Sequence, residues 1–507
     1  MDATERLKED LREGRVDAEK LVELIVSSQR RLDAATRELE AAKRRIAELE
    51  KQLGPTASAK VDQPFSMRAE ERRQEARGKK RRRKNRPTRR GRVTTAEKVR
   101  QAARTEKVFP EGVAKSNCQL SHTRPVWRLE NGQAVLVAYE VYRGPNSQFG
   151  KIPGTLGRSE FGIEIVIAIA YQVYVVGLSF DKVCLLLNFF QNLGLRKSQA
   201  DALLRQLSRH WAGEFERLCA LLANSAVVHA DETGWSIRSV WAFLSETVRV
   251  LFFGVHKDAD TLQAILDPAT FAGIVVSDDA AVYANFTHSQ KCWAHLLRKA
   301  IKLTLLEPNN AEFRRFTDRL LEIYRAACRA QSDKRLSDTG RARKVAELDD
   351  EILDLCGGVW AAELPKGEGA EDDYRLLCTE LMRLMLDRQL FTFVTAAPVA
   401  TPQGTTQPVP GTNNEAERTL RGPAMARKMG RTNKTPAGAR RQTIIVSVLE
   451  SLRNHLPSFT LSTVIDEITR WLKTGRSCFR ELAEKLGLPT TPATPTVLDR
   501  ILPRPSG

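Results

Sequence analysis

The 507-residue sequence has eight cysteines but no Cys-x-x-Cys pair. The scatter argues against a disulfide framework or a zinc ribbon and fits a reducing compartment. The eight positions are Cys118, Cys184, Cys219, Cys292, Cys328, Cys356, Cys378 and Cys478.

The sequence also lacks a secretory signal and a clear membrane span. Residues 1–19 carry charges throughout, whereas a signal peptide has an apolar central stretch. Residues 161–180 approach the length of a membrane span, but Glu164 and Gln172 lie within them, so we predict a buried helix. We therefore expect a cytoplasmic protein with no membrane partner.

Positive charge is in excess and unevenly distributed. The formal net charge is +18, and residues 79–92 contain ten Lys or Arg and no acid. Such a run cannot build a core, so we expect an extended arm that binds DNA phosphates. A solubilising segment is the alternative. The arm's proposed phosphate contacts are Lys79, Lys80, Arg81, Arg82, Arg83, Lys84 and Arg86.

Residues 1–54 have the pattern of an N-terminal coiled coil. Apolar side chains recur every seven residues at Ile25, Leu32, Leu39, Ile46 and Leu53. We expect this seam to drive homo-oligomerisation, although one amphipathic helix packed on its own chain would show the same spacing. Residues 55–107 follow as a basic, largely disordered linker.

Residues 108–222 are predicted to hold a small β element and a helical DNA-binding region. Glu130-Asn131-Gly132 signals a β-hairpin. Helices from about 177 to 191 and from about 198 to 210 flank a short turn that contains Gly194, as in a helix-turn-helix. Arg205 and Arg209 would contact DNA from the second helix. An ordinary helical hairpin has the same pattern.

From residue 223 the periodicity changes to that of an α/β domain. Apolar runs and helical stretches alternate through residue 306 in the order three strands, helix, strand, helix, strand, helix. This is the order of a ribonuclease H-like fold, in which the first and fourth strands are neighbours. Asp231 and Asp278 follow those two strands, so their carboxylates are expected side by side.

Two neighbouring aspartates suit divalent metal chemistry on DNA. Two Mg²⁺ ions can activate a water or a 3′-hydroxyl and stabilise the leaving oxygen. Mg²⁺ binds a few carboxylates together with water and substrate phosphates. A third acid is expected from a later helix that begins near Asn413. Glu415 and Glu417 lie on different faces of that helix, so only one can join the site. Alternatively, both acids only complement the helix dipole.

The remaining segments are assigned by their periodicity and composition. Residues 307–400 read as a helical insertion, 401–475 as the second part of the catalytic core, and 476–507 as a tail. Several cations follow Glu417 and could hold DNA phosphates, although a solvated helix face would have the same composition. These cations are Arg418, Arg421, Arg427, Lys428 and Arg431.

Four motifs carry a family resemblance. They are HADETGW at 229–235, VVSDDAAVY at 275–283, CWAHLLRKA at 292–300, and the segment at 412–440 that begins TNNEAERTLRG. Over roughly residues 158–455 the chain resembles the bacterial DDE transposases of the insertion-sequence 66 family. The resemblance implies that Asp231, Asp278 and Glu417 form a metal-binding catalytic triad. Glu417 fills the glutamate of the family's Asn-Asn-x-x-Glu-Arg pattern.

The resemblance has further implications for site support and partners. Cys292 and His295 would be its Cys-x-x-His motif, supporting the site together with Asn413; on spacing alone, the Cys and His could also bind a metal. Two Mg²⁺ ions are expected, with Mn²⁺ as a substitute. Many members of the family carry a Cys-rich zinc module ahead of the region of resemblance. This chain has only Cys118 before residue 158, so we expect no structural zinc.

The resemblance implies double-stranded DNA as a partner, as transposon ends and target, together with accessory proteins. It also implies that the protein associates with the bacterial nucleoid. Two other functions remain open at this point. One is a non-catalytic or domesticated DNA-binding relative, and the other is a ribonuclease H-like nuclease that only hydrolyses.

Overall fold

The computed structural model describes residues 37, 93–362, 369–401, 404–489 and 496–502. From residue 93 on, these belong to one compact unit that spans residues 70–507. The predicted coiled coil at 1–54 and the basic run at 79–86 lie outside the described residues and stay predictions.

The first described part is a small β domain. It contains α4 (Thr95–Arg100), β1 (Arg104–Val108), β2 (Gln119–Glu130) and β3 (Gln133–Arg143), in the sheet order β1-β3-β2. Asn131 and Gly132 both have positive φ and connect β2 to β3, which confirms the hairpin. The element starts earlier than predicted, because α4 and β1 occupy residues assigned to the linker.

Three helices follow the β domain. The apolar stretch at 161–180 forms the buried helix α5 (Ile163–Ala170) and a π-helical turn, Tyr171–Val175. The buried Glu164 pairs with Arg128 of β2 at 2.9 Å, which accounts for a charge inside this helix. Among the described residues, no helix is long and apolar enough to cross a membrane.

The two helices predicted as a helix-turn-helix are α6 (Phe180–Gln191) and α7 (Lys197–Ala223), and they pack on each other. The second continues well past residue 210, because its buried face extends the hydrophobic core toward the central sheet. Arg205 and Arg209 lie on its exposed face. DNA binding by this pair remains a prediction.

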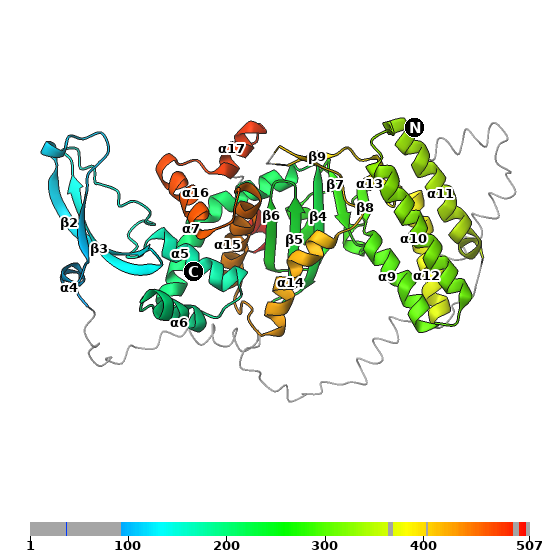
Figure 1. The fold of residues 1–507 in the computed structure, drawn as a ribbon, viewed down its shortest axis with the longest axis horizontal. Helices are drawn as coiled ribbons and strands as arrows, with labels where there is room; N and C mark the ends of the chain where they lie inside the picture. Colours follow the sequence, from blue (N-terminus) through cyan, green and yellow to red (C-terminus); the bar gives the residue numbers. More distant parts are fainter. Residues whose placement is uncertain (1–36, 38–92, 363–368, 402–403, 490–495, 503–507) are drawn as a thin grey trace, which may run out of the picture. The chain divides into compact units, whose positions relative to one another are not determined.

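A five-stranded mixed sheet forms the centre of the unit (Figure 1). Its strands run in the order β6-β5-β4-β7-β8. The first and fourth strands of the domain are parallel neighbours, as predicted. The bounds are β4 Val227–Gly234, β5 Ser239–Ser245, β6 Arg249–Val255, β7 Ile274–Ser277 and β8 Ser289–Lys291, with α8 at Ala259–Ile265 and a short 3-10 turn at Ala281–Tyr283.

Two strand boundaries differ from the sequence prediction. The first strand continues past Asp231 to Gly234, because its antiparallel pairing with β5 extends beyond the end of β7. The sequence pattern places the fifth strand at residues 291–294. The strand is instead Ser289–Lys291, since Cys292 is the N-cap residue of the following helix, α9 (Trp293–Leu306).

Helices cover both faces of the sheet. Alternate strand residues pack against α7 on one face and against α14 (Asn414–Lys428) on the other. Figure 1 shows α14 crossing in front of the strands.

The edge strand β6 is covered by α15 (Pro436–His455). The side-chain oxygens of Thr443, Ser447 and Ser451 accept hydrogen bonds of 2.9–3.0 Å from amides of alternate β6 residues. These three residues are four apart, so they lie along one helix face and satisfy an edge that would otherwise be open to another strand.

The insertion between β8 and α14 is helical, as predicted. It contains α10 (Ala311–Ser332), α11 (Asp338–Ala361), α12 (Ala370–Leu386) and the short α13 (Thr392–Thr395), followed by a two-stranded ribbon of β9 (Val399–Ala400) and β10 (Thr406–Gln407). The helices share a hydrophobic core with α9 and with the β7 side of the sheet.

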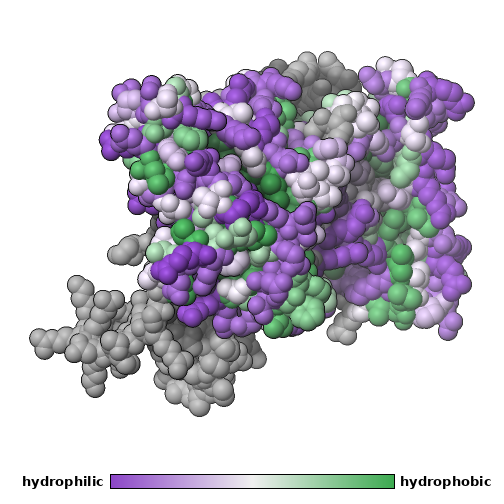
Figure 2. Space-filling model, turned by 60° about the vertical axis from the view of Figure 1, so that its left-hand side comes forward, coloured by the Kyte–Doolittle hydropathy of each residue, from purple (hydrophilic) through white to green (hydrophobic). Residues whose placement is uncertain are grey.

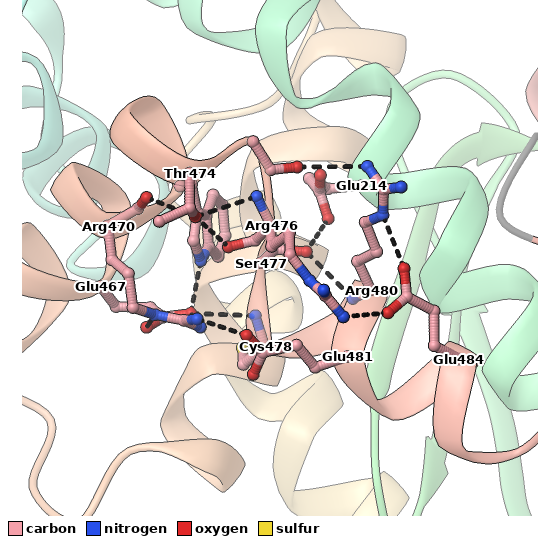
Figure 3. Close-up of polar contacts among 12 residues, drawn as sticks. Glu214, Glu467, Arg470, Thr474, Arg476, Ser477, Cys478, Arg480, Glu481 and Glu484 are labelled. Atoms are coloured by element: carbon pink, nitrogen blue, oxygen red, sulfur yellow. Dashed lines mark hydrogen bonds and ion pairs between the residues drawn. The ribbon is translucent and has the colours of Figure 1, made fainter.

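The described residues after 475 are not a tail, and the sequence prediction was wrong here. After α16 (Leu461–Thr474) the chain forms α17 (Cys478–Lys485) and α18 (Val497–Ile501), and Phe479 and Leu498 are fully buried. Figure 3 shows how polar contacts hold α17. Ser477 donates a hydrogen bond to Glu214 of α7 and caps α17 by accepting one from the Arg480 amide.

Hydrophilic residues cover most of the face drawn in Figure 2, with smaller hydrophobic patches between them.

Candidate active site

Asp231 and Asp278 come from neighbouring parallel strands. In the register of β4 and β7, His229 is opposite Val276, and each aspartate lies two residues beyond that pair. Asp231 is still within β4, whereas Asp278 is the first residue after β7. The adjacency expected from strand order is therefore present in the structure.

Asn413 fixes the start of α14 beside these strands. The residue is fully buried, and its Nδ2 donates a hydrogen bond of 2.8 Å to the carbonyl of Ala230. Its Oδ1 lies 3.2 Å from Nδ1 of His229, and its backbone N–H lies 3.1 Å from Sγ of Cys292. The side chain of this one buried residue thus connects α14 to β4, and its backbone N–H connects α14 to the start of α9.

Glu417 lies one helical turn after Asn413 and faces α9. Its Oε1 is 2.6 Å from Nη2 of Arg298 and 3.6 Å from Nδ1 of His295. Glu415 points elsewhere and pairs with Arg249 of β6 at 2.5 Å. The two glutamates therefore serve different faces of α14, as their spacing predicts.

The acids next to the two aspartates are neutralised by cations from other elements. Glu232 pairs with Lys257 at 2.7 Å, and Asp279 pairs with Arg383 of α12. Asp231 makes no ion pair with any described residue. Burial raises its pKa to about 7, and the negative charges of Glu232, Asp278 and Glu417 add to this rise.

An uncompensated, half-buried carboxylate beside other acids fits a divalent cation. Carboxylate oxygens are the ligands that Mg²⁺ prefers, and a cation between Asp231 and Asp278 would offset the burial and the negative charges that together raise the pKa of Asp231. The residues present therefore suit such an ion.

Another group of potential ligands lies beside this pair. Ligand atoms of Cys292, His295 and Glu417 are all within 4.8 Å of one another, the one such set of three in the part of the chain that the structure describes. Burial raises the pKa of the Cys292 thiol, and Glu417 is already paired with Arg298. The grouping is thus no evidence of zinc.

A cleft of about 250 Å³ opens on the Asp278 side, between the sheet and the insertion helix α12. Its charged lining comes from both parts. The strand ends contribute Asp278, Asp279 and Lys291, α9 contributes His295 and Lys299, and α12 contributes Glu380.

The basic residues of α14 divide into two groups. Arg418 and Arg421 are exposed in the same helix as Glu417, and Lys428 is exposed at its end. Arg427 and Arg431 instead donate hydrogen bonds to the carbonyls of Gly234 and Gly177, which gives both a structural contact.

Sequence reasoning missed four residues around the acids. Lys257, Tyr283, Lys291 and Arg298 contact acids or backbone of the site. Tyr283 and Arg298 stand inside the motifs at 275–283 and 292–300, but a motif alone does not say which acid each residue contacts.

Comparison with known families agrees with the resemblance seen in the motifs. A search of curated proteins finds no match to this chain. The family model described as "Transposase IS66 family" matches residues 158–441, more than half of the chain and a span that includes all three acids. This chain therefore belongs to the IS66 family of transposases.

Proposed function

We propose that this chain is a DDE transposase, which cleaves DNA at transposon ends and joins the freed 3′-hydroxyl to target DNA. The observation that carries the proposal is the placement of Asp231 and Asp278 on neighbouring strands, with Glu417 close enough to raise the pKa of Asp231. The sheet order β6-β5-β4-β7-β8 agrees with a ribonuclease H-like catalytic domain.

Asp231, Asp278 and Glu417 would hold two Mg²⁺ ions, which Mn²⁺ could replace. When bound, these ions would supply activation of the attacking hydroxyl and stabilisation of the leaving oxygen. The protein's own contribution is positioning. Asn413 holds the helix of Glu417 against β4, and the β4–β7 pairing sets the spacing of the aspartates.

Arg298 also has a role in this proposal. Its guanidinium pairs with Glu417, so the third acid is already neutralised by a partly exposed cation of α9. A DNA phosphate that enters the site would compete for this guanidinium and release Glu417 as a ligand. Exposed Arg418 and Arg421 would bind the backbone of the same strand.

The test is cleavage and strand transfer with a transposon-end duplex, a target duplex and Mg²⁺. We expect Asp231→Asn, Asp278→Asn and Glu417→Gln to abolish both products. Glu415→Gln is the matched control, since this acid lies two residues from Glu417 but pairs with Arg249. Wild-type activity in any of the first three variants would refute the triad. Cleavage without strand-transfer product would instead indicate a nuclease.

A further inference from the structure

Three buried polar side chains lie close to the two aspartates and have no place in the proposed triad. They are Glu232 in β4, Tyr283 in the 3-10 turn after β7, and Lys291 at the end of β8. The side chain of Glu232 is 2% exposed, Tyr283 is fully buried and Lys291 is 3% exposed.

These side chains connect the strands that carry the aspartates. The Tyr283 hydroxyl donates a hydrogen bond of 2.6 Å to Oε2 of Glu232, while Oε1 pairs with Lys257. On the other side, Nζ of Lys291 lies 5.7 Å from the centre of the Tyr283 ring. The same ammonium is 3.3 Å from Oγ of Ser277 and 3.4 Å from the carbonyl oxygen of Asp278.

Both oxygens of Glu232 are therefore used within the protein, and Lys291 contacts the backbone of Asp278 from the neighbouring strand β8. We propose that Lys291 and the Tyr283–Glu232 hydrogen bond are positioning elements that hold the end of β7 against β4, and so set the separation of the Asp231 and Asp278 carboxylates. This inference rests on the proposed function.

Stability alone does not account for Lys291. It makes no ion pair with any residue that the structure describes, and its hydrogen bonds at 3.3 and 3.4 Å are long. A buried ammonium without a close counter-charge loses hydration that such contacts do not restore, so an apolar side chain of similar size would fold as well or better. We therefore attribute the presence of Lys291 to its contact with Asp278, which positions that residue.

The experiment compares Lys291→Met and Tyr283→Phe with wild type in the full chain. Lys299→Met is the matched control, because Lys299 lines the same cleft but is exposed and pairs with Glu380 of α12. The measurements are Mn²⁺ binding by calorimetry without DNA, thermal melting, and cleavage as a function of Mn²⁺ and of DNA concentration.

For Lys291→Met we expect Mn²⁺ binding weaker by about tenfold or more, as for other residues that orient metal ligands. Its melting temperature should not fall, and the KM for DNA should stay near wild type. Tyr283→Phe should weaken Mn²⁺ binding in the same direction, and Lys299→Met should not. A merely structural role would lower the melting temperature and leave the metal affinity of the folded protein unchanged.

Mn²⁺ affinity within about twofold of wild type in both variants would overturn the inference. Tighter binding by Lys291→Met would overturn it too, because the ammonium would then act only as a repelling charge. The Asp278→Asn variant distinguishes failure of the positioning inference from failure of the proposed function. If Asp278→Asn binds Mn²⁺ as wild type does, the metal site itself is wrong and both proposals fall; if it loses binding, only the positioning role is refuted.

Discussion

Replacing Asp231 with asparagine is expected to stabilise the metal-free protein while abolishing catalysis. The two side chains have the same shape, and the asparagine oxygen can still accept the hydrogen bond that Asp231 Oδ1 receives from the Glu232 amide at 2.9 Å. The substitution therefore removes little besides the negative charge. That charge is costly in the folded state, because burial and the neighbouring acids oppose ionisation.

The size and the pH range of this effect follow from the pKa values. The pKa of Asp231 is about 7 in the folded protein and 3.8 for an ordinary aspartate, a difference equivalent to about 4 kcal/mol. The folded state binds the proton more tightly, so ionisation favours the unfolded state. Wild type should lose this stability as the pH rises from about 4 to about 7, and the loss should be complete above pH 7. The asparagine variant cannot ionise there, so it avoids the loss.

Melting temperatures of both proteins, measured in chelator from pH 4 to pH 8, test this reasoning. The variant should melt near wild type at pH 4 and several degrees higher at pH 8. Mg²⁺ added at pH 8 should stabilise wild type and have little effect on the variant. Asp260→Asn, at an exposed position on α8, is the control for a general effect of charge. A difference in melting temperature between Asp231→Asn and wild type that does not grow with pH would refute the assignment of Asp231 as a buried carboxylate without a counter-charge.

Three more predictions address the parts around the site. Asn413→Ala should cost about 1–3 kcal/mol of unfolding free energy in denaturant melts, because it leaves the buried Ala230 carbonyl without its donor. It should also abolish cleavage by releasing α14, and a fully active variant would contradict this. Ser447→Ala should cost about 1–3 kcal/mol in the same melts with cleavage unchanged, since it orphans the Leu251 amide at the sheet edge; unaltered stability would count against the edge contact. Deletion of residues 1–54 should reduce the mass in light scattering to that of the monomer, and an unchanged multiple of the chain mass would exclude the heptad seam as the assembly element.

Periodicity predicted the strand order of the central domain because each strand is a short apolar run bounded by turns. The adjacency of the first and fourth strands followed from that order and is present in the structure. The end of the chain was assigned as a tail because its prolines and short helices leave no sustained period. Only tertiary contacts, such as the burial of Phe479, show that it packs. The α15 contacts to β6 could not be predicted for a similar reason, since the sequence of an apolar helix does not indicate which strand edge its Ser and Thr side chains contact.

The acids of the site show most clearly what spacing can and cannot determine. A spacing of two positions was enough to place Glu415 and Glu417 on different faces of one helix, because the angle between them depends only on helical geometry. The alternation of side chains along a strand likewise turns Glu232 away from Asp231, but it does not say what Glu232 contacts. Its partners, Tyr283 and Lys257, come from distant elements that meet only after the sheet has formed. Which acid stays without a counter-charge therefore depends on the cations that other elements deliver. Among the described residues these cations pair with Glu232, Asp279 and Glu417, but with neither Asp231 nor Asp278.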